Sequence, residues 1–176
     1  WLNEAGRIEA DLTVTKLDAT FGAGNVGHQY LVVAADNAHR HAETWIKRHT
    51  PSDAHCFTTD VTSAYAQINI QGPRSRELLQ RVSTADFSNT AFPFGTSQEI
   101  DLGYATVRAT RLTYVGELGW ELYVPAEFAA HVFETLQSAG TEFGLTPAGM
   151  HTMNNCRMEK AYRHWGHDIS DEETPI

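Results

Sequence analysis

A change of periodicity near the middle of the chain is the feature that most constrains its fold. Residues 64–70, Ala-Tyr-Ala-Gln-Ile-Asn-Ile, alternate in side-chain character, and Gly72-Pro73 follows at once. Alternation with a period of two predicts a strand, and proline suits the first turn of a helix because its missing N–H would have no partner there. Leu78, Leu79 and Val82 then recur at helical spacing. We therefore predict a strand that leads directly into a helix.

Strand and helix patterns recur on both sides of this junction. The other predicted strands cover residues 8–16, 30–34, 97–102, 104–112 and 120–124, with a glycine-rich loop at 22–25 joining the first two. Helices are predicted from Asn37 to Pro51, from Pro125 to Gly140, and from Thr146-Pro147 onward. Neighbouring strands of the hairpin type, without strict strand–helix–strand alternation, predict an α+β fold in which helices cover antiparallel or mixed sheets.

The composition excludes several classes of protein. A net charge of −9, with 13 dispersed Lys and Arg residues, argues against a nucleic-acid partner. The sequence has no uninterrupted apolar run of about 18 residues, so a soluble protein without a membrane partner is expected. Two cysteines without a CxxC pair predict neither a disulfide framework nor a thiolate zinc site. A cytoplasmic location is expected, or the mitochondrial matrix in a eukaryote.

Three charged residues stand beside apolar ones. Asp11 lies within a strand-like run, Glu121 follows a glycine-bounded loop and Trp120, and Arg157 lies on the apolar side of the last predicted helix. A charge kept near apolar surface must be paired or must meet a ligand. Each also has a structural explanation: Asp11 as an exposed strand position, Glu121 as a cross-strand partner, and Arg157 as a side chain that reaches solvent.

Histidine and glycine patterns indicate no further cofactor site. The histidines at 39 and 41, and those at 164 and 167, lack the i, i+4 spacing of a zinc-binding helix and have no evident third ligand. No metal site is therefore predicted. The glycines at 22, 24 and 27 lack the strand–turn–helix context of a dinucleotide loop.

Four segments, in order along nearly the whole chain, resemble the aminomethyltransferase (glycine-cleavage T-protein) family. Residues 3–14 are similar to the family pattern N-E-x-G-G-I-x-D-D-L-x-V, in which Asp11 matches the second aspartate while Arg7 and Ala10 depart from it. The other three matching segments are 70–73, 114–121 and 156–169. The last, with R-M-E-K-A-Y-R-H-W-G-H-D-I-S, is most similar to folate domains fused to FAD-dependent dimethylglycine and sarcosine dehydrogenases.

The resemblance implies a fold and a domain organisation. It implies ferredoxin-like lobes and a tetrahydrofolate-binding domain of which residues 1–176 form the greater part. The expected lobes are 1–55 with 141–176, and 56–140. Because the chain opens at Trp1 without Met, flanking parts of a longer protein are expected to be missing.

The resemblance also implies roles for five residues. Glu121 would accept two hydrogen bonds from the pterin ring, and Arg157 would help to secure the cofactor. Tyr114 and Trp165 would supply flat apolar surface for its rings. Asp11 would be the catalytic residue, near N5 and N10, where it would orient tetrahydrofolate and assist proton movements. These residues are expected to converge on one cavity.

The implied function is the capture of a one-carbon unit from oxidative demethylation of dimethylglycine or sarcosine, as 5,10-methylenetetrahydrofolate. The chain would be the one-carbon transferase domain of an enzyme whose FAD lies outside this chain, so by itself it is not expected to catalyse the oxidation. A flavin domain would supply the amine or methylene donor. The alternatives are a glycine-cleavage T-protein or folate-dependent demethylase, and a non-catalytic regulatory relative such as the regulatory subunit of pyruvate dehydrogenase phosphatase.

Overall fold

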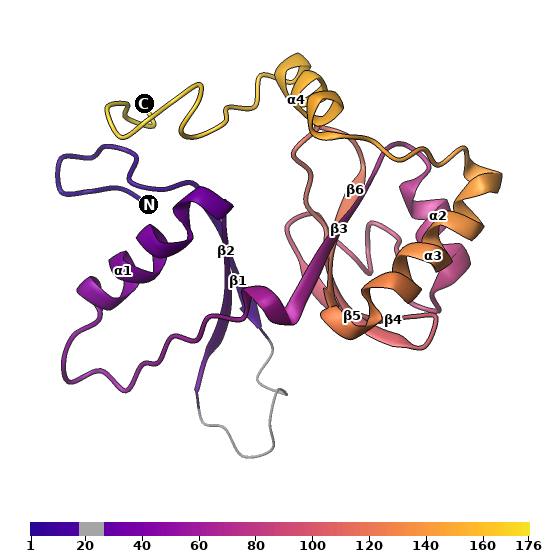
Figure 1. Cartoon of the computed structure of the whole chain (residues 1–176), viewed down its shortest axis with the longest axis horizontal. Helices are drawn as coiled ribbons and strands as arrows, with labels where there is room; N and C mark the ends of the chain where they lie inside the picture. Colours follow the sequence, from indigo (N-terminus) through magenta and orange to yellow (C-terminus); the bar gives the residue numbers. More distant parts are fainter. Residues whose placement is uncertain (18–26) are drawn as a thin grey trace. The chain divides into compact units, whose positions relative to one another are not determined.

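The computed structural model describes residues 1–17 and 27–176, which divide into two compact units (Figure 1). The first unit contains Trp1–Asp60 and Arg163–Ile176, and the second contains Val61–Tyr162. Residues 141–162, which the sequence interpretation grouped with the N-terminal lobe, thus belong to the second unit. The physical reason is Leu145, which packs against the core of that unit and whose backbone N–H donates to the Gly140 carbonyl at 2.9 Å.

The first unit is built on a hairpin and one helix. Strands β1 (Leu12–Leu17) and β2 (Gln29–Ala34) pair antiparallel, with Leu12 opposite Ala34. A 3-10 turn at Asp36–Ala38 leads into α1 (His39–His49). The predicted hairpin and helix are present, although β1 begins four residues later than expected because Ile8 forms only an isolated bridge with Leu2. The predicted loop at 22–25 lies outside the described residues.

The second unit contains a four-stranded antiparallel sheet with the spatial order β3-β6-β5-β4. Its strands are β3 (Tyr65–Gln71), β4 (Ser97–Leu102), β5 (Ala105–Thr110) and β6 (Gly119–Pro125). Its helices are α2 (Ser75–Val82), α3 (Ala129–Gly140) and α4 (Met150–Glu159). Short 3-10 turns occupy Thr62–Ala64, Ala126–Phe128 and Thr141–Phe143.

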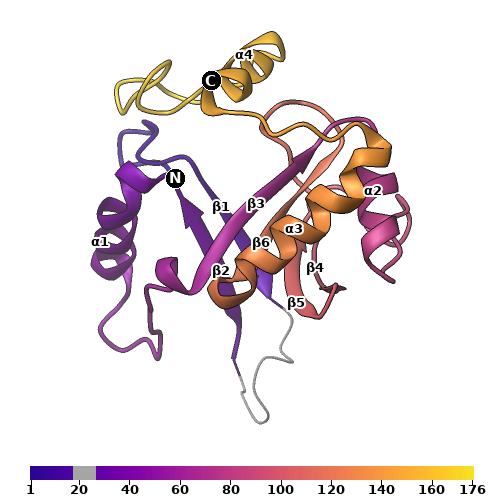
Figure 2. The same ribbon diagram turned by 45° about the vertical axis from the view of Figure 1, so that its right-hand side comes forward.

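The helices α2 and α3 cover one face of this sheet. Figures 1 and 2 show them side by side, and α3 contacts both β3 and β6. Trp120 is fully buried on this face, with the Phe87 and Phe92 rings edge-on at centroid distances of 5.3 and 6.0 Å. Edge-to-face contacts of this kind add to the stabilisation that comes from burial alone. The core is therefore centred on Trp120 at the start of β6.

The predicted α+β fold with helix-covered antiparallel sheets is confirmed. Within the described part of the second unit, the chain order is strand–helix–strand–strand–strand–helix–helix. A ferredoxin-like fold has two strands between its helices and a final strand after the second helix. The unit therefore shares the layers of a ferredoxin-like lobe, but residues 61–162 have a third strand between α2 and α3 and a helix, α4, where the final strand would follow.

The turn between β4 and β5 depends on Gly103. Its φ is +63°, and a Cβ added there would lie 2.3 Å from Nε2 of His131 on α3. His131 cannot easily move away, because its ring stacks on Tyr104 at a centroid distance of 3.5 Å and its Nε2 accepts the Tyr104 backbone N–H. The β4–β5 turn therefore contacts α3 through the Tyr104–His131 pair.

Replacing Gly103 with alanine is expected to destabilise the protein more than the same change at Gly95. Gly95 also has a positive φ, +78°, but an added Cβ meets no atom within 4 Å. Both variants carry backbone strain, whereas only Gly103→Ala must displace His131, so it should lose about 1 kcal/mol more of the free energy of unfolding. Urea denaturation of both variants measures the difference. Equal losses would show that the His131 contact contributes nothing.

Candidate functional site

A cavity of about 630 Å³ lies wholly within the second unit, along the edge strand β3 of the described sheet. Its size lies within the range of small-molecule and cofactor sites. The wall is mainly apolar, with a few polar side chains. Apolar lining comes from Ile68, Ile70, Phe133, Leu136, Leu145 and Met153, and polar lining from Asn69, Gln71, Tyr114, Glu117, Glu121 and Gln137.

One wall of the cavity is segment 145–149, which has no regular secondary structure and which the sequence interpretation placed partly in a helix. The predicted start of the last helix at Thr146-Pro147 is wrong, since α4 begins at Met150 after an extended Gly149 with φ −90° and ψ 175°. Gly144, in the left-handed conformation, ends the preceding 3-10 turn and redirects the chain. The segment that follows lines the cavity.

Glu121 lies in the cavity wall on the sheet face opposite the core. In the β3–β6 register, Ile70 pairs with Trp120 and Asn69 pairs with Glu121. Because side chains alternate along a strand, the first pair faces the helices and the second pair faces the other side. That face is polar: Thr110 donates to Ser97 at 2.9 Å, and Arg108 forms an ion pair with Glu99 at 3.2 Å.

The carboxylate of Glu121 is held by Tyr123, which lies two residues further along β6. The Tyr123 hydroxyl donates to Oε2 of Glu121 at 2.6 Å. Burial, with the hydrogen bond to Glu121 as a second cause, raises the pKa of Tyr123 above its usual value, so the phenol remains a donor. An ionised carboxylate has about four lone-pair sites, so Glu121 retains acceptor capacity for a ligand.

Tyr114 supplies an aromatic wall. Its ring stacks on that of Tyr162 at a centroid distance of 6.4 Å and an interplanar angle of 19°. The loop that carries it is ordered by Thr113, whose hydroxyl accepts the backbone N–H groups of Val115 and Glu117 at 3.2 and 3.3 Å. Tyr114 and Glu121 therefore line the same cavity, as the sequence interpretation requires.

Arg157 is buried, with 6% exposure, on α4. Its guanidinium donates to the Tyr162 carbonyl at 3.1 Å and to the Asn154 side chain at 3.3 Å, while its neighbour Cys156 lines the cavity. Met150 and Met158 of the same helix are more than half exposed, so α4 has no continuous buried methionine face. In the structure Arg157 fixes the end of α4 beside the cavity, and its contact with a cofactor stays a prediction.

Asp11 and Trp165 belong to the first unit. Asp11 is exposed immediately before β1. The indole N–H of Trp165 donates to the Ile8 carbonyl at 3.3 Å, which ties the C-terminal segment to the N-terminal one. The catalytic role of Asp11, the cofactor contact of Trp165 and their approach to the cavity stay predictions.

Sequence reasoning missed several lining or supporting residues. Asn69 and Gln71 occupy polar positions of an alternating run, and Tyr123 follows Glu121 by two residues. A period of two places Tyr123 on the face of Glu121, and Asn69 with Gln71 on one face of their own strand, and this was the available signal. Phe133 and Met153 carried no comparable signal, because their approach to β3 depends on helix packing.

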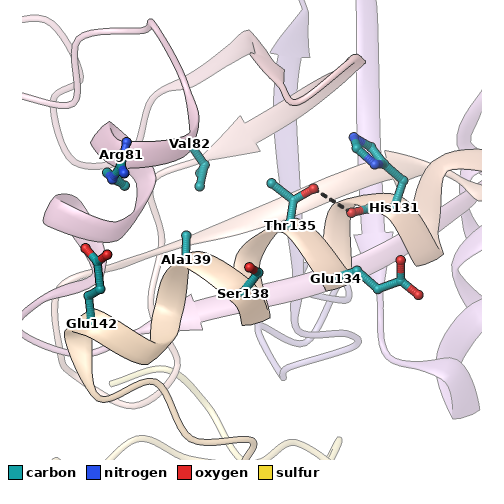
Figure 3. A pocket seen from close by; sticks show the side chains of 8 residues that line it. All are labelled: Arg81, Val82, His131, Glu134, Thr135, Ser138, Ala139 and Glu142. Atoms are coloured by element: carbon teal, nitrogen blue, oxygen red, sulfur yellow. Dashed lines mark hydrogen bonds between the residues drawn. The ribbon is translucent and has the colours of Figure 1, made fainter.

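A second hollow, of about 640 Å³, lies between α2 and α3 (Figure 3). Most of its lining side chains are spread along α3, and Arg81 and Val82 of α2 lie across from them. The Thr135 hydroxyl is already bonded to the His131 carbonyl of the same helix at 2.8 Å. No predicted site residue is present, so the β3 cavity is the candidate site.

Residues 1–17 and 27–176 contain neither a cluster of metal ligands nor a membrane-spanning helix. Within this described part of the chain, no three His, Cys, Asp or Glu residues gather as metal ligands would. No helix there is both long and apolar enough to cross a membrane.

Known proteins are similar to nearly the whole chain, including the segments that carry the sequence motifs. Mitochondrial sarcosine dehydrogenase of Mus musculus is 36% identical over 183 residues, covering 99% of this chain and 20% of that protein. The mitochondrial pyruvate dehydrogenase phosphatase regulatory subunit of Mus musculus is 30% identical over 176 residues, covering 99% of this chain and 19% of that protein. The chain thus spans about a fifth of the length of these relatives.

Fold similarity and a family model agree with these matches. Heterotetrameric sarcosine oxidase from Corynebacterium sp. U-96, solved in complex with pyrrole 2-carboxylate, superimposes with a TM-score of 0.60 at 19% identity, covering 82% of this chain and 66% of that chain. The model described as the GCVT N-terminal domain matches residues 1–176. The chain therefore belongs to the GCVT, or aminomethyltransferase (glycine-cleavage T-protein), family.

Proposed function

We propose that this chain is a tetrahydrofolate-binding domain that captures a one-carbon unit from oxidative demethylation of sarcosine or dimethylglycine, as 5,10-methylenetetrahydrofolate. The observation that carries the proposal is the Glu121 carboxylate, held by Tyr123 in the wall of a largely apolar cavity that Tyr114 also lines. The sarcosine dehydrogenase relative supports the substrate class. Its mitochondrial name supports the matrix as one of the two expected locations.

The residues present fit a pterin. A pterin ring needs flat apolar surface and an acceptor for its adjacent ring N–H and amino group, and a carboxylate accepts both bonds in one plane. In this chain Ile68, Ile70 and Tyr114 supply the surface and Glu121 supplies the acceptor. Bound tetrahydrofolate would supply two nitrogen atoms that take up the one-carbon unit.

Asp11 is the proposed catalytic residue. Asp11 is exposed, and a carboxylate can accept a proton when a nearby nitrogen atom develops positive charge. Arg157 and Trp165 are proposed to bind the cofactor as well. Oxidation of the methylamine is assigned to an FAD domain outside this chain, which would be the partner that delivers the one-carbon unit.

A regulatory role is the second candidate. The similarity to the pyruvate dehydrogenase phosphatase regulatory subunit, at 30% identity, favours it. The retention of Asp11, Glu121 and Arg157 favours the enzymatic role, since a partner-binding domain requires no carboxylate in the wall of a largely apolar cavity. Folate binding separates the two candidates.

Changing Glu121 to Gln is expected to weaken binding of 5-formyltetrahydrofolate by about ten- to a hundredfold, because one acceptor and the negative charge are lost. Isothermal titration calorimetry of the protein encoded by the complete gene measures the dissociation constant. Glu127→Gln is the matched control, since Glu127 is an exposed residue of the same unit. A wild-type protein without folate affinity would exclude the proposed function, as would unchanged affinity in the Glu121 variant.

Changing Tyr123 to Phe is expected to weaken the same binding by about tenfold, because the carboxylate loses the bond that orients it. Tyr65→Phe, at a more exposed position of β3, serves as the control and should bind normally. In a double-mutant cycle, Tyr123→Phe should have little further effect once Glu121 is Gln. Fully additive losses would argue that Tyr123 acts independently of Glu121.

Changing Asp11 to Asn is expected to lower the turnover number for 5,10-methylenetetrahydrofolate formation by about a hundredfold, while folate affinity changes little. Steady-state assay and calorimetry of the complete protein separate the two quantities. Asp53→Asn, at another exposed position of the first unit, is the control. Normal turnover in the Asp11 variant would remove Asp11 from the mechanism.

A further inference from the structure

Asn69 lies directly beside Glu121 in the cavity wall. The two residues are opposite each other in the antiparallel register of β3 and β6, and both line the cavity. Side chains opposite each other in such a pair have Cβ atoms about 4.5–5.5 Å apart. A planar ligand edge that reaches the Glu121 carboxylate therefore also reaches the Asn69 amide.

The hydrogen bond with Gln67 determines which end of the Asn69 amide is available. Nε2 of Gln67 donates to Oδ1 of Asn69 at 3.3 Å. The oxygen is thereby used by a residue of the same strand, two positions earlier on the same face. Nδ2 of Asn69, with two N–H donors, has no protein acceptor among the described residues. Asn69 therefore offers donors to the cavity.

Gln71, the other amide of β3 that lines the cavity, has its donor end occupied. Its Nε2 donates to the Leu112 carbonyl at 3.4 Å, while its Oε1 is buried against Gly119 without a hydrogen-bond partner in the described part of the chain and is an acceptor, not a donor. Gln71 is also paired with Gly119 in the sheet, and not with Glu121. Asn69 is thus the donor in register with the carboxylate.

The cavity wall thus presents the two carboxylate oxygens of Glu121 as acceptors and the Asn69 amide beside them as a donor. A ligand edge is complementary when it carries two donors followed by an acceptor. The pterin of tetrahydrofolate presents a 2-amino group, a ring N–H at position 3 and a carbonyl oxygen at position 4, which are two donors followed by one acceptor. The Glu121 carboxylate matches the two donors. We propose that Asn69 donates to the 4-oxo oxygen and makes this cavity selective for 4-oxo over 4-amino pteridines, an inference that rests on the proposed folate site.

The contribution of Asn69 to this selectivity arises from an unpaired donor. It adds to the contribution of Glu121, because a neutral 4-amino ring has no N–H at position 3 for the carboxylate to accept. A 4-amino pteridine places an NH₂ group where the 4-oxo oxygen would lie, so it faces the Asn69 N–H donors without an acceptor between them. Asn69 is exposed in the structure, so its donors would lose water only when a bound ring covers them. A donor that is covered without an acceptor costs more than a weak contact, and sites built on such bonds reject analogues that lack the matching group. Aspartate at position 69 would reverse the preference, since it accepts from an amino group and repels a carbonyl oxygen.

The test compares tetrahydrofolate with tetrahydroaminopterin, its 4-amino counterpart, as ligands of the protein encoded by the complete gene. The quantity measured is the ratio of the two dissociation constants by anaerobic calorimetry. Asn69→Asp is expected to shift this ratio toward the 4-amino ligand by about tenfold or more, and Asn69→Ala by a smaller factor in the same direction. Asn89→Asp is the matched control, because Oδ1 of Asn89 accepts from Arg76 and aspartate keeps that acceptor.

The outcomes separate this inference from the proposed function. An unchanged ratio in both Asn69 variants, with tetrahydrofolate still bound by the wild type and weakened by Glu121→Gln, overturns the role of Asn69 and leaves the folate site intact. Absence of binding of either ligand to the wild type overturns both. Should Asn69→Asp fold poorly, the ratio measured with Asn69→Ala decides, since an effect on folding alone would weaken both ligands equally.

Discussion

The antiparallel pairing of β3 with β6 is the interaction on which the rest of the second unit depends. Its register sets Ile70 opposite Trp120 and Asn69 opposite Glu121, so one hydrogen-bonded pair of strands faces the core and the candidate site at once. A slip of one residue would turn Trp120 out of the core and Glu121 into it. Burial of Trp120 against Phe87 and Phe92 stabilises the register and thereby positions the carboxylate.

The cavity combines two surfaces that a single sheet keeps apart. Ile68 and Ile70 belong to the helix-covered face, whereas Asn69 and Glu121 belong to the polar face, and all four line the hollow because it follows the edge of β3. An edge strand lets a ligand meet both faces of the pleat. The apolar side suits flat rings, and the polar side supplies directional bonds to one edge of them.

Membership of the GCVT family leaves the choice between catalysis and regulation to the site itself. A sarcosine dehydrogenase and a phosphatase regulatory subunit are similar to nearly the whole chain at 36% and 30% identity. A fold hosts several functions, so the chemistry of particular side chains decides between them. Here Tyr123 holds Glu121, Asn69 presents donors beside it and Asp11 is exposed, which is a set of groups that a purely structural domain does not need.

Local periodicity determined the strands, most helices, the inward side of Arg157 and the candidacy of Glu121, because each depends on residues within a few positions along the chain. The candidacy of Tyr114 came from the family resemblance. Tertiary structure decided what depends on distant partners. The irregular segment 145–149 before α4 and the unit boundary at Tyr162 follow from the packing of Leu145 on the core. The position of Asn69 beside Glu121 follows from cross-strand register, which pairs residues about 50 positions apart. The contact of Tyr123 with Glu121 is local, because the two residues lie two positions apart on β6.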